Sequence, residues 1–186
     1  AILSKKTGSP IKIFWDREDD MRHGYYHASC AQTLKAGVDG MGKVTSWRHR
    51  TAFPSIQSTF APGVKHGMAF ELNLGAADLP FDIPNIRVEN GEAEAHVRIG
   101  WVRSVNNINH AFAVGSFVDE LAHSAGRDPA EYLLELIGEP RHNDVSSEAG
   151  GDIHNYGRSL EDFPQDTGRM ANVIKIVMEN SGWGKD

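Results

Sequence analysis

Two helices in direct succession, between residues 107 and 138, constrain the fold more than any other feature of the chain. In the first, apolar residues recur at the spacing of a helix buried along one side: Ala111, Val114, Val118, Leu121, Ala122 and Ala125. Asn107 or Asn109 can cap its start, and Gly126 can supply the left-handed residue that commonly ends a helix. We therefore expect one long helix here.

The second helix begins almost immediately after the first. Asp128 supplies a capping side chain, Pro129 suits the first helical position, and Glu131 places an acid in the first turn. Gly138 is expected to end this helix, so that the following Glu139 and Pro140 lie beyond its C-terminus. The two helices are thus predicted to stand in tandem.

The first half of the chain has the residue pattern of strands. Residues 26–38 and 44–51 flank the glycine-rich connection 39–43, which predicts a hairpin of two antiparallel strands. Further strand-like runs lie at residues 11–15, 86–89 and 93–99. Strands in the first half and helices in the second predict an α+β fold, with helices packed on a mainly antiparallel sheet. We expect residues 1–186 to form a single domain.

The two ends and the intervening loops complete this outline. Residues 1–8 resemble the last turn of a helix that ends at Gly8, and a chain that opens in mid-helix is expected to be a piece of a larger polypeptide. Thr167 is predicted to cap a final helix that ends near Gly182. Residues 53–77 and 139–166 are expected to be mainly irregular.

Composition and charge exclude several classes of function. The net charge of −6 is spread over both halves with no basic stripe, so nucleic acid is not an expected partner. No apolar run approaches the roughly 20 residues of a membrane-spanning helix, so we expect a soluble chain. The single cysteine, Cys30, excludes an internal disulfide and any iron–sulfur or zinc site built from several cysteines of this chain.

Common catalytic and metal-binding patterns are also missing. His23 and His27 have a spacing that could bind a metal on a helix, but the residues between them favour no helix and no third ligand is near in sequence. The acidic residues 16–20 are interpreted as a solvated corner after a strand. The sequence has no Gly-x-Ser-x-Gly, Walker or Gly-x-Gly-x-x-Gly pattern, and Cys30 is expected to be an inert packing residue. We therefore expect no metal site and no catalytic residue.

Residues 100–107 have the strongest claim to a function. They form a non-repetitive segment that leads into the long helix, and a helix N-terminus presents backbone N–H groups to an anion. Arg103 could add a charge-assisted pair of hydrogen bonds. Most such loops bind nothing, so these local features leave both readings open.

Three spaced motifs carry a resemblance to a known family. They are Arg17-Glu18-Asp19-Asp20-Met21 after a strand-like run, Phe81-Asp82-Ile83-Pro84-Asn85, and Trp101-Val102-Arg103-Ser104-Val105 followed by Asn109-His110-Ala111-Phe112-Ala113 and Ser116-Phe117-Val118-Asp119-Glu120-Leu121-Ala122. In this order they resemble the molybdopterin-binding subunits of the xanthine dehydrogenase and aldehyde oxidase family, nearest its isoquinoline oxidoreductase branch. The resemblance runs over nearly the whole chain.

The resemblance implies a cofactor and a site. It places Trp101, Arg103, Ser104 and Val105 beside molybdopterin, with most weight on Arg103. The alternatives are core packing for Trp101 and a salt bridge that holds the loop for Arg103. Asn106 stands where relatives commonly have glycine, which leaves the backbone path of the loop open.

The resemblance also implies a function for the parent protein. It would oxidise an N-heterocycle or an aldehyde with water as the oxygen source, and would pass electrons to an iron–sulfur or other electron-transfer subunit. The glycine-rich cofactor loop and the catalytic glutamate of the family are expected outside these 186 residues, so the isolated chain is expected to lack both molybdopterin and activity. The alternative is a non-catalytic structural or assembly domain.

Overall fold

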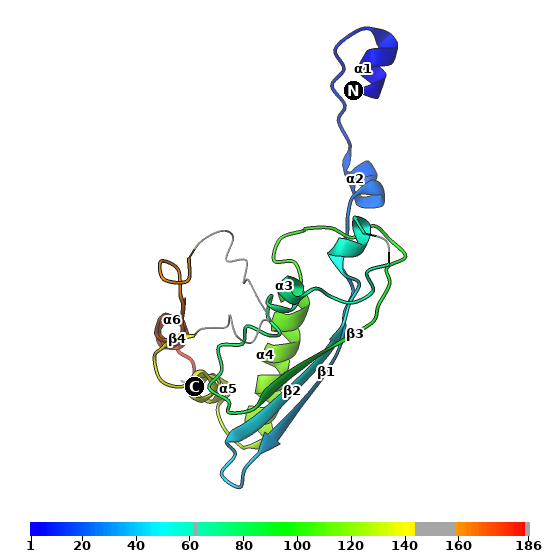
Figure 1. The fold of residues 1–186 in the computed structure, drawn as a ribbon. Helices are drawn as coiled ribbons and strands as arrows, with labels where there is room; N and C mark the ends of the chain where they lie inside the picture. The colour runs from blue at the N-terminus through cyan, green and yellow to red at the C-terminus, as the bar shows by residue number, and fades with distance from the viewer. Residues whose placement is uncertain (62, 144–158, 185–186) are drawn as a thin grey trace.

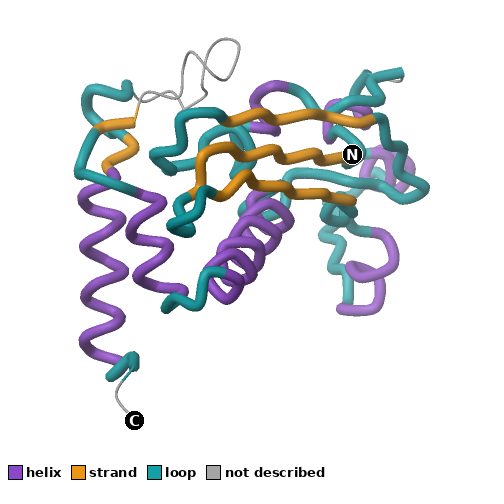
Figure 2. The backbone as a smooth tube through the Cα atoms, turned by 90° about the horizontal axis from the view of Figure 1, so that it is seen from below, coloured by secondary structure: helices purple, strands orange, loops and turns teal. Residues whose placement is uncertain are grey.

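The computed structural model describes residues 1–61, 63–143 and 159–184. A three-stranded sheet in the order β1-β2-β3 forms the centre, and helix α4 (Asn107–Ser124) lies along one of its faces (Figures 1 and 2). Helices α5 (Pro129–Ile137) and α6 (Thr167–Ser181) pack side by side next to this unit. The predicted α+β class is confirmed.

The hairpin forms as the sequence predicts. β1 (Ala31–Val38) pairs antiparallel with β2 (Val44–Ala52). In the connection between them, the Asp39 carboxylate accepts hydrogen bonds from the Met41 amide at 2.8 Å and the Lys43 amide at 3.0 Å. Gly42 has a φ of 83°, a conformation that glycine adopts without steric cost.

The third strand makes the sheet mixed instead of mainly antiparallel. β3 (Ile86–Gly91) pairs with β2 in parallel, from Trp47 opposite Ile86 to Ala52 opposite Gly91. Parallel pairing requires a crossover that carries the chain back to the start of the sheet. The segment between β2 and β3 provides this crossover, and it contains the 3-10 turn η1 (Ile56–Thr59) and the short helix α3 (Ala69–Leu72).

The core lies between the sheet and the tandem helices. The Trp47 ring packs edge-on against Phe81 and Phe117, with ring centroids 5.6 and 5.1 Å apart. The buried stripe of α4 and the apolar face of α5 complete the cluster, which includes Val44, Leu79, Ile83, Val114, Val118, Ala122, Tyr132, Leu136 and Ile137. The Tyr132 hydroxyl donates a hydrogen bond of 2.8 Å to the Gly42 carbonyl, which ties α5 to the hairpin turn.

The helix ends follow the sequence with two corrections. The N-cap of α4 is Asn106, which makes no capping side-chain hydrogen bond, and not Asn107 or Asn109 as predicted. Asp128 caps α5 by accepting hydrogen bonds from the amides of Ala130 and Glu131, and Gly138 ends the helix. The cap of α6 is Asp166, whose side chain accepts from the Arg169 amide, and not Thr167 as predicted. The Thr167 hydroxyl instead accepts a hydrogen bond from the Arg141 amide at 2.9 Å.

Short strands β4 (His142–Asn143) and β5 (Gln165–Asp166) close the base of the polar segment 139–166. The middle of that segment, residues 144–158, lies outside the described residues.

The N-terminal region departs most from the predictions. α1 (Ile2–Thr7) ends at Gly8 as expected. Residues 11–15, however, form no strand, because no described strand runs beside them, and they extend away from the sheet (Figure 1). The acidic residues that follow begin helix α2 (Arg17–His23), which Asp16 caps by accepting from the Asp19 amide at 2.8 Å.

The predicted strand at residues 93–99 is also missing. Only single bridges form at its borders, from Tyr26 to Ile99 and from His66 to Glu92.

Candidate functional site

The loop of residues 100–106 is held firmly at both ends. At its start, the Gly100 amide donates to the Tyr26 carbonyl at 3.2 Å, and the Tyr26 amide donates to the Arg98 carbonyl at 2.9 Å. At its end, the Asn106 carbonyl accepts from the amides of Asn109 at 3.1 Å and His110 at 3.0 Å, which opens helix α4. The loop is therefore fixed between the bridge at Ile99 and the first turn of α4.

The backbone inside the loop is strained. Ser104 has a φ of 67° and Val105 a φ of 46°, and they are the two non-glycine residues with positive φ in the described part of the chain. For a β-branched residue this conformation is a genuine outlier, and left-handed non-glycine residues cost about 1–3 kcal/mol each. Such strain persists only where the surrounding structure enforces it.

The strained turn leaves several backbone donors without a partner. Within residues 1–61, 63–143 and 159–184, the amides of Arg103, Ser104 and Asn106 find no hydrogen-bond acceptor. Free N–H groups at the start of a helix form an environment that suits an anion or a ring with acceptor atoms.

The structure brings the four predicted site residues together on this loop. Trp101, Arg103 and Ser104 are exposed, and Val105 is half-buried. The Trp101 side chain is not part of the core, since 55% of it is exposed and it stacks on Phe70 with ring centroids 5.6 Å apart. No acidic side chain in the described chain forms a salt bridge with Arg103, so the guanidinium group is available.

Two buried amide side chains have unused hydrogen-bonding atoms, one at the end of the loop and one in the segment that follows α3. Asn106 is 2% exposed and its Nδ2 has no acceptor, while both polar side-chain atoms of Asn73 lack a partner at 7% exposure. A buried polar atom left unpaired costs about 1–3 kcal/mol, so these side chains lower the stability of this part of the chain.

The segment that carries Phe70 and Asn73 packs beside α4 and is anchored by a buried carboxylate. Glu71 is fully buried and accepts hydrogen bonds from the Ser55 hydroxyl at 2.6 Å and from the amides of Ile56 and Met68, each at 2.8 Å. These bonds fix α3, and with it the ring beneath Trp101. Sequence reasoning missed Phe70, Asn73 and Glu71, because no motif or periodicity links them to a loop about 30 residues away.

A pair of buried histidines joins the first turns of α4 to the sheet. The Nδ1–H of His110 donates to the Leu74 carbonyl at 2.8 Å, so its Nε2 accepts from the Thr51 hydroxyl at 3.1 Å. The Nε2–H of His49 donates to the Gln32 side-chain oxygen at 2.7 Å. In these bonds the neutral form of each ring donates one proton, from Nδ1 in His110 and from Nε2 in His49.

Burial disfavours the charged form of both histidine rings. It lowers the pKa of His49 to about 4, with a smaller contribution from His110, and it lowers the pKa of His110 as well. The two histidines that join the first turns of α4 to the sheet are thus neutral and hydrogen-bonded.

The remaining candidates of the sequence are not drawn into this site. Burial raises the pKa of the Cys30 thiol, which lies 3.1 Å from the Thr51 hydroxyl, so an activated thiolate is not favoured. His23 lies in α2 and His27 beyond its end, and the described side chains include no cluster of three or more metal-binding residues. Across the described ranges, every helix is too short or too polar to cross a bilayer.

Comparison with known proteins decides the family. The molybdopterin cofactor-binding domain matches residues 1–134. The chain belongs to this family. Among curated relatives, the chain is 27% identical over its whole length to a membrane-bound aldehyde dehydrogenase (pyrroloquinoline-quinone) of Gluconacetobacter polyoxogenes, of which it covers 23%.

Two further relatives are named as components of larger enzymes. A nicotinate dehydrogenase subunit of Pseudomonas putida is 28% identical over 77% of the chain, which covers 13% of that protein. The beta subunit of isoquinoline 1-oxidoreductase of Brevundimonas diminuta is 24% identical over 76% of the chain, which covers 19% of that protein. The chain therefore spans less than a quarter of the length of each of these relatives.

The side chains and amides of the loop can be compared with the chemistry of molybdopterin, the cofactor for which the family is named. Molybdopterin combines a flat pterin ring system, rich in donors and acceptors, with an anionic phosphate. The unpartnered amides of the loop offer hydrogen bonds to such a ring, and Arg103 offers a charge to an anion. The residues present fit the cofactor.

Proposed function

We propose that loop 100–106 forms one wall of a molybdopterin site in a longer polypeptide. The observation that carries the proposal is the strained turn at Ser104 and Val105, which leaves backbone donors free at the start of α4. In a chain of the molybdopterin cofactor-binding domain family, the cofactor would accept hydrogen bonds from these donors, and its binding would account for the strained backbone.

Each residue of the proposed wall has a distinct task. Arg103 binds an anionic or strongly accepting atom of the cofactor or substrate with its guanidinium group. Ser104 and Val105 hold the backbone so that the amides face outward. Trp101, supported by Phe70, presents a flat apolar face against which a ring can stack and from which water is excluded. None of these groups is proposed to transfer a proton, and no catalytic residue is assigned to this chain.

The parent protein is proposed to be a molybdenum hydroxylase that acts on an N-heterocycle or an aldehyde. When bound, the cofactor accepts two electrons from the substrate while water supplies the oxygen atom. An iron–sulfur or other electron-transfer subunit is the proposed acceptor. The names of the relatives, which include an aldehyde dehydrogenase and an isoquinoline oxidoreductase, support this choice of substrates.

The proposal is tested by replacing Arg103 in the full-length parent. Arg103→Ala is expected to lower the molybdenum content per protomer, or the turnover number, by on the order of tenfold, because it removes a charge-assisted pair of hydrogen bonds. Arg103→Lys keeps the charge without the planar fork and should lie between Ala and the native residue. Arg169→Ala, on the exposed side of α6, is the matched control.

Elemental analysis and turnover decide between the possible outcomes. If Arg103→Ala retains native molybdenum content and native rate while Arg169→Ala does the same, the site assignment is wrong. A parent that contains no molybdenum would instead favour the non-catalytic domain, or the quinone named for one relative. The isolated chain is expected to contain no molybdenum and to oxidise neither isoquinoline nor an aldehyde with a dye acceptor.

A further inference from the structure

The two faces of the sheet differ sharply in their chemistry. Residues at alternate positions of the strands, such as Trp47 and His49, point into the core. On the opposite, open face, Lys35 of β1 stands directly opposite Arg48 of β2, which stands directly opposite Arg87 of β3. We call these three side chains the basic row.

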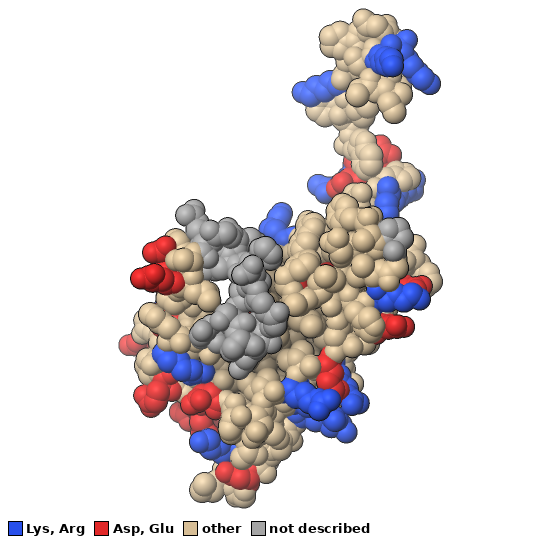
Figure 3. All heavy atoms as spheres, viewed as in Figure 1, with Lys and Arg blue, Asp and Glu red and all other residues tan. Residues whose placement is uncertain are grey.

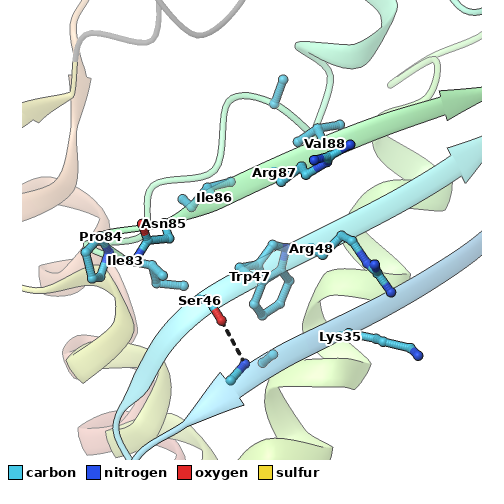
Figure 4. Close-up of a pocket in the computed structure, with 13 residues that line it drawn as sticks. Lys35, Ser46, Trp47, Arg48, Ile83, Pro84, Asn85, Ile86, Arg87 and Val88 are labelled. Carbon is cyan, nitrogen blue, oxygen red and sulfur yellow. Dashed lines mark hydrogen bonds between the residues drawn. The ribbon is translucent and has the colours of Figure 1, made fainter.

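Figure 4 shows the basic row beside Ser46, with the charged ends of Lys35 and Arg48 extending in the same direction from neighbouring strands. In the space-filling view, Lys and Arg atoms gather over this part of the sheet (Figure 3). The residues line a shallow hollow of about 850 Å³, whose lining also includes Ser46 and Asn85. The basic row is thus accessible to a side chain or segment of a partner molecule.

The basic row is only partly neutralised. In the next row, Arg50 stands opposite Glu89, and that carboxylate forms ion pairs with Arg50 and, at 2.7 Å, with Arg87. The hydrogen bond from Arg50 lowers the pKa of Glu89, which therefore stays ionised. Among the described residues, Lys35 and Arg48 have no ion pair.

This arrangement opposes the stability of the isolated chain. Like charges directly opposite each other on neighbouring strands are destabilising, and here three stand in one line. The chain as a whole carries a net charge of −6, so the positive charge of this face does not follow from composition. A counter-charge from outside the chain would remove the repulsion.

We propose that the basic row docks an acidic surface of a partner polypeptide. Two of its three members are arginines, whose guanidinium groups match the geometry of carboxylates. Adjacent strands lie about 4.8 Å apart, so the row is only about 10 Å wide, which suits a few carboxylates and not a long polyanion. The negative net charge of the chain also opposes the approach of nucleic acid. This inference does not depend on the proposed molybdopterin site.

The test measures binding of a fluorescent oligoglutamate peptide to the full chain by anisotropy at low ionic strength. The double variant Lys35→Gln and Arg48→Gln, which keeps the pair of Arg87 and Glu89, is expected to bind on the order of tenfold more weakly. The control variant Lys6→Gln and Lys175→Gln makes the same change in net charge at exposed positions of α1 and α6, and should bind nearly as the native chain does.

Thermal unfolding provides a second readout that moves in the opposite direction. Because the double variant removes repulsion within the row, its melting temperature should rise slightly while its affinity falls, so the loss of binding cannot come from unfolding.

Four results would overturn the proposal. They are no binding of oligoglutamate by the native chain, equal weakening in both variants, tighter binding of a single-stranded oligonucleotide of matched charge, and self-association that the double variant abolishes. The third would assign the surface to nucleic acid, and the last to a second copy of this chain.

Discussion

The core face of the sheet and loop 100–106 both contact helix α4, yet they differ in burial, backbone conformation and hydrogen bonding. The core around Trp47 is buried and built from apolar side chains, most of them in regular helices and strands. The loop exposes its tryptophan, holds Ser104 and Val105 in the left-handed region, and leaves amides unpartnered. The strain and the free amides of the loop cost stability that the core does not give up, and the proposed function assigns this cost to the binding of a cofactor.

The largest expected effect contrasts a tryptophan of the core with that of the loop. Trp47→Ala should destabilise the chain by about 3–5 kcal/mol, because it removes a fully buried ring and leaves a cavity. Trp101→Ala should cost less than about 1 kcal/mol, since that side chain is 55% exposed. Denaturant unfolding followed by circular dichroism measures both. Equal losses for the two variants would remove the distinction between the regions.

A smaller effect should appear in the pH dependence of stability. Burial lowers the pKa of His49 from 6.5 to about 4, so between these values the unfolded chain binds a proton that the folded chain excludes. The stability is therefore fully present above pH 6.5 and is lost as the pH falls toward 4, by about 3 kcal/mol in total. Because burial also lowers the pKa of His110, that ring adds to the loss with the same sign.

The variant His49→Gln should reduce this slope, while the control His96→Gln, at an exposed position, should leave it unchanged. Denaturant unfolding at several pH values between about 4 and 7.5 provides the measurement, because histidine titrates over roughly this range. A native slope in His49→Gln would mean that other groups cause the loss of stability.

The smallest effect concerns the strain in the loop. Ser104→Gly should stabilise the chain by about 0.5–1 kcal/mol, because glycine adopts a positive φ without strain. The relief of this strain should exceed the extra conformational entropy that glycine loses on folding. Ser29→Gly, at an exposed position without a positive φ, should be neutral or slightly destabilising. Unfolding midpoints compare the two. If Ser104→Gly destabilised the chain as much as Ser29→Gly does, the strain would be absent in solution.

The parts of the fold that local chemistry determines could be predicted from the sequence. The spacing in α4, the cap at Asp128, the stop at Gly138 and the turn at 39–43 each depend on a few neighbouring residues. The parallel pairing of β3 could not be predicted, because it depends on how residues 53–85 return across the sheet.

The candidate site shows the same limit. The resemblance indicated residues 101–105, but the left-handed turn was not predicted, since neither Ser104 nor Val105 is glycine. The stack of Trp101 on Phe70 joins two segments with no shared pattern. The basic row was likewise hidden, because its three charges come from separate strands and become neighbours only through the register of the sheet.

The hydrogen bond from Tyr132 to Gly42 has a consequence for the order in which the molecule assembles. It joins residues 90 positions apart, and because closing so long a segment of chain costs entropy, we expect this bond to form after the hairpin and α5. Once it is made, opening the turn breaks this bond to α5, and moving α5 away leaves the Gly42 carbonyl without its donor. The hairpin turn and a helix of the core, from distant parts of the chain, are thereby expected to open together.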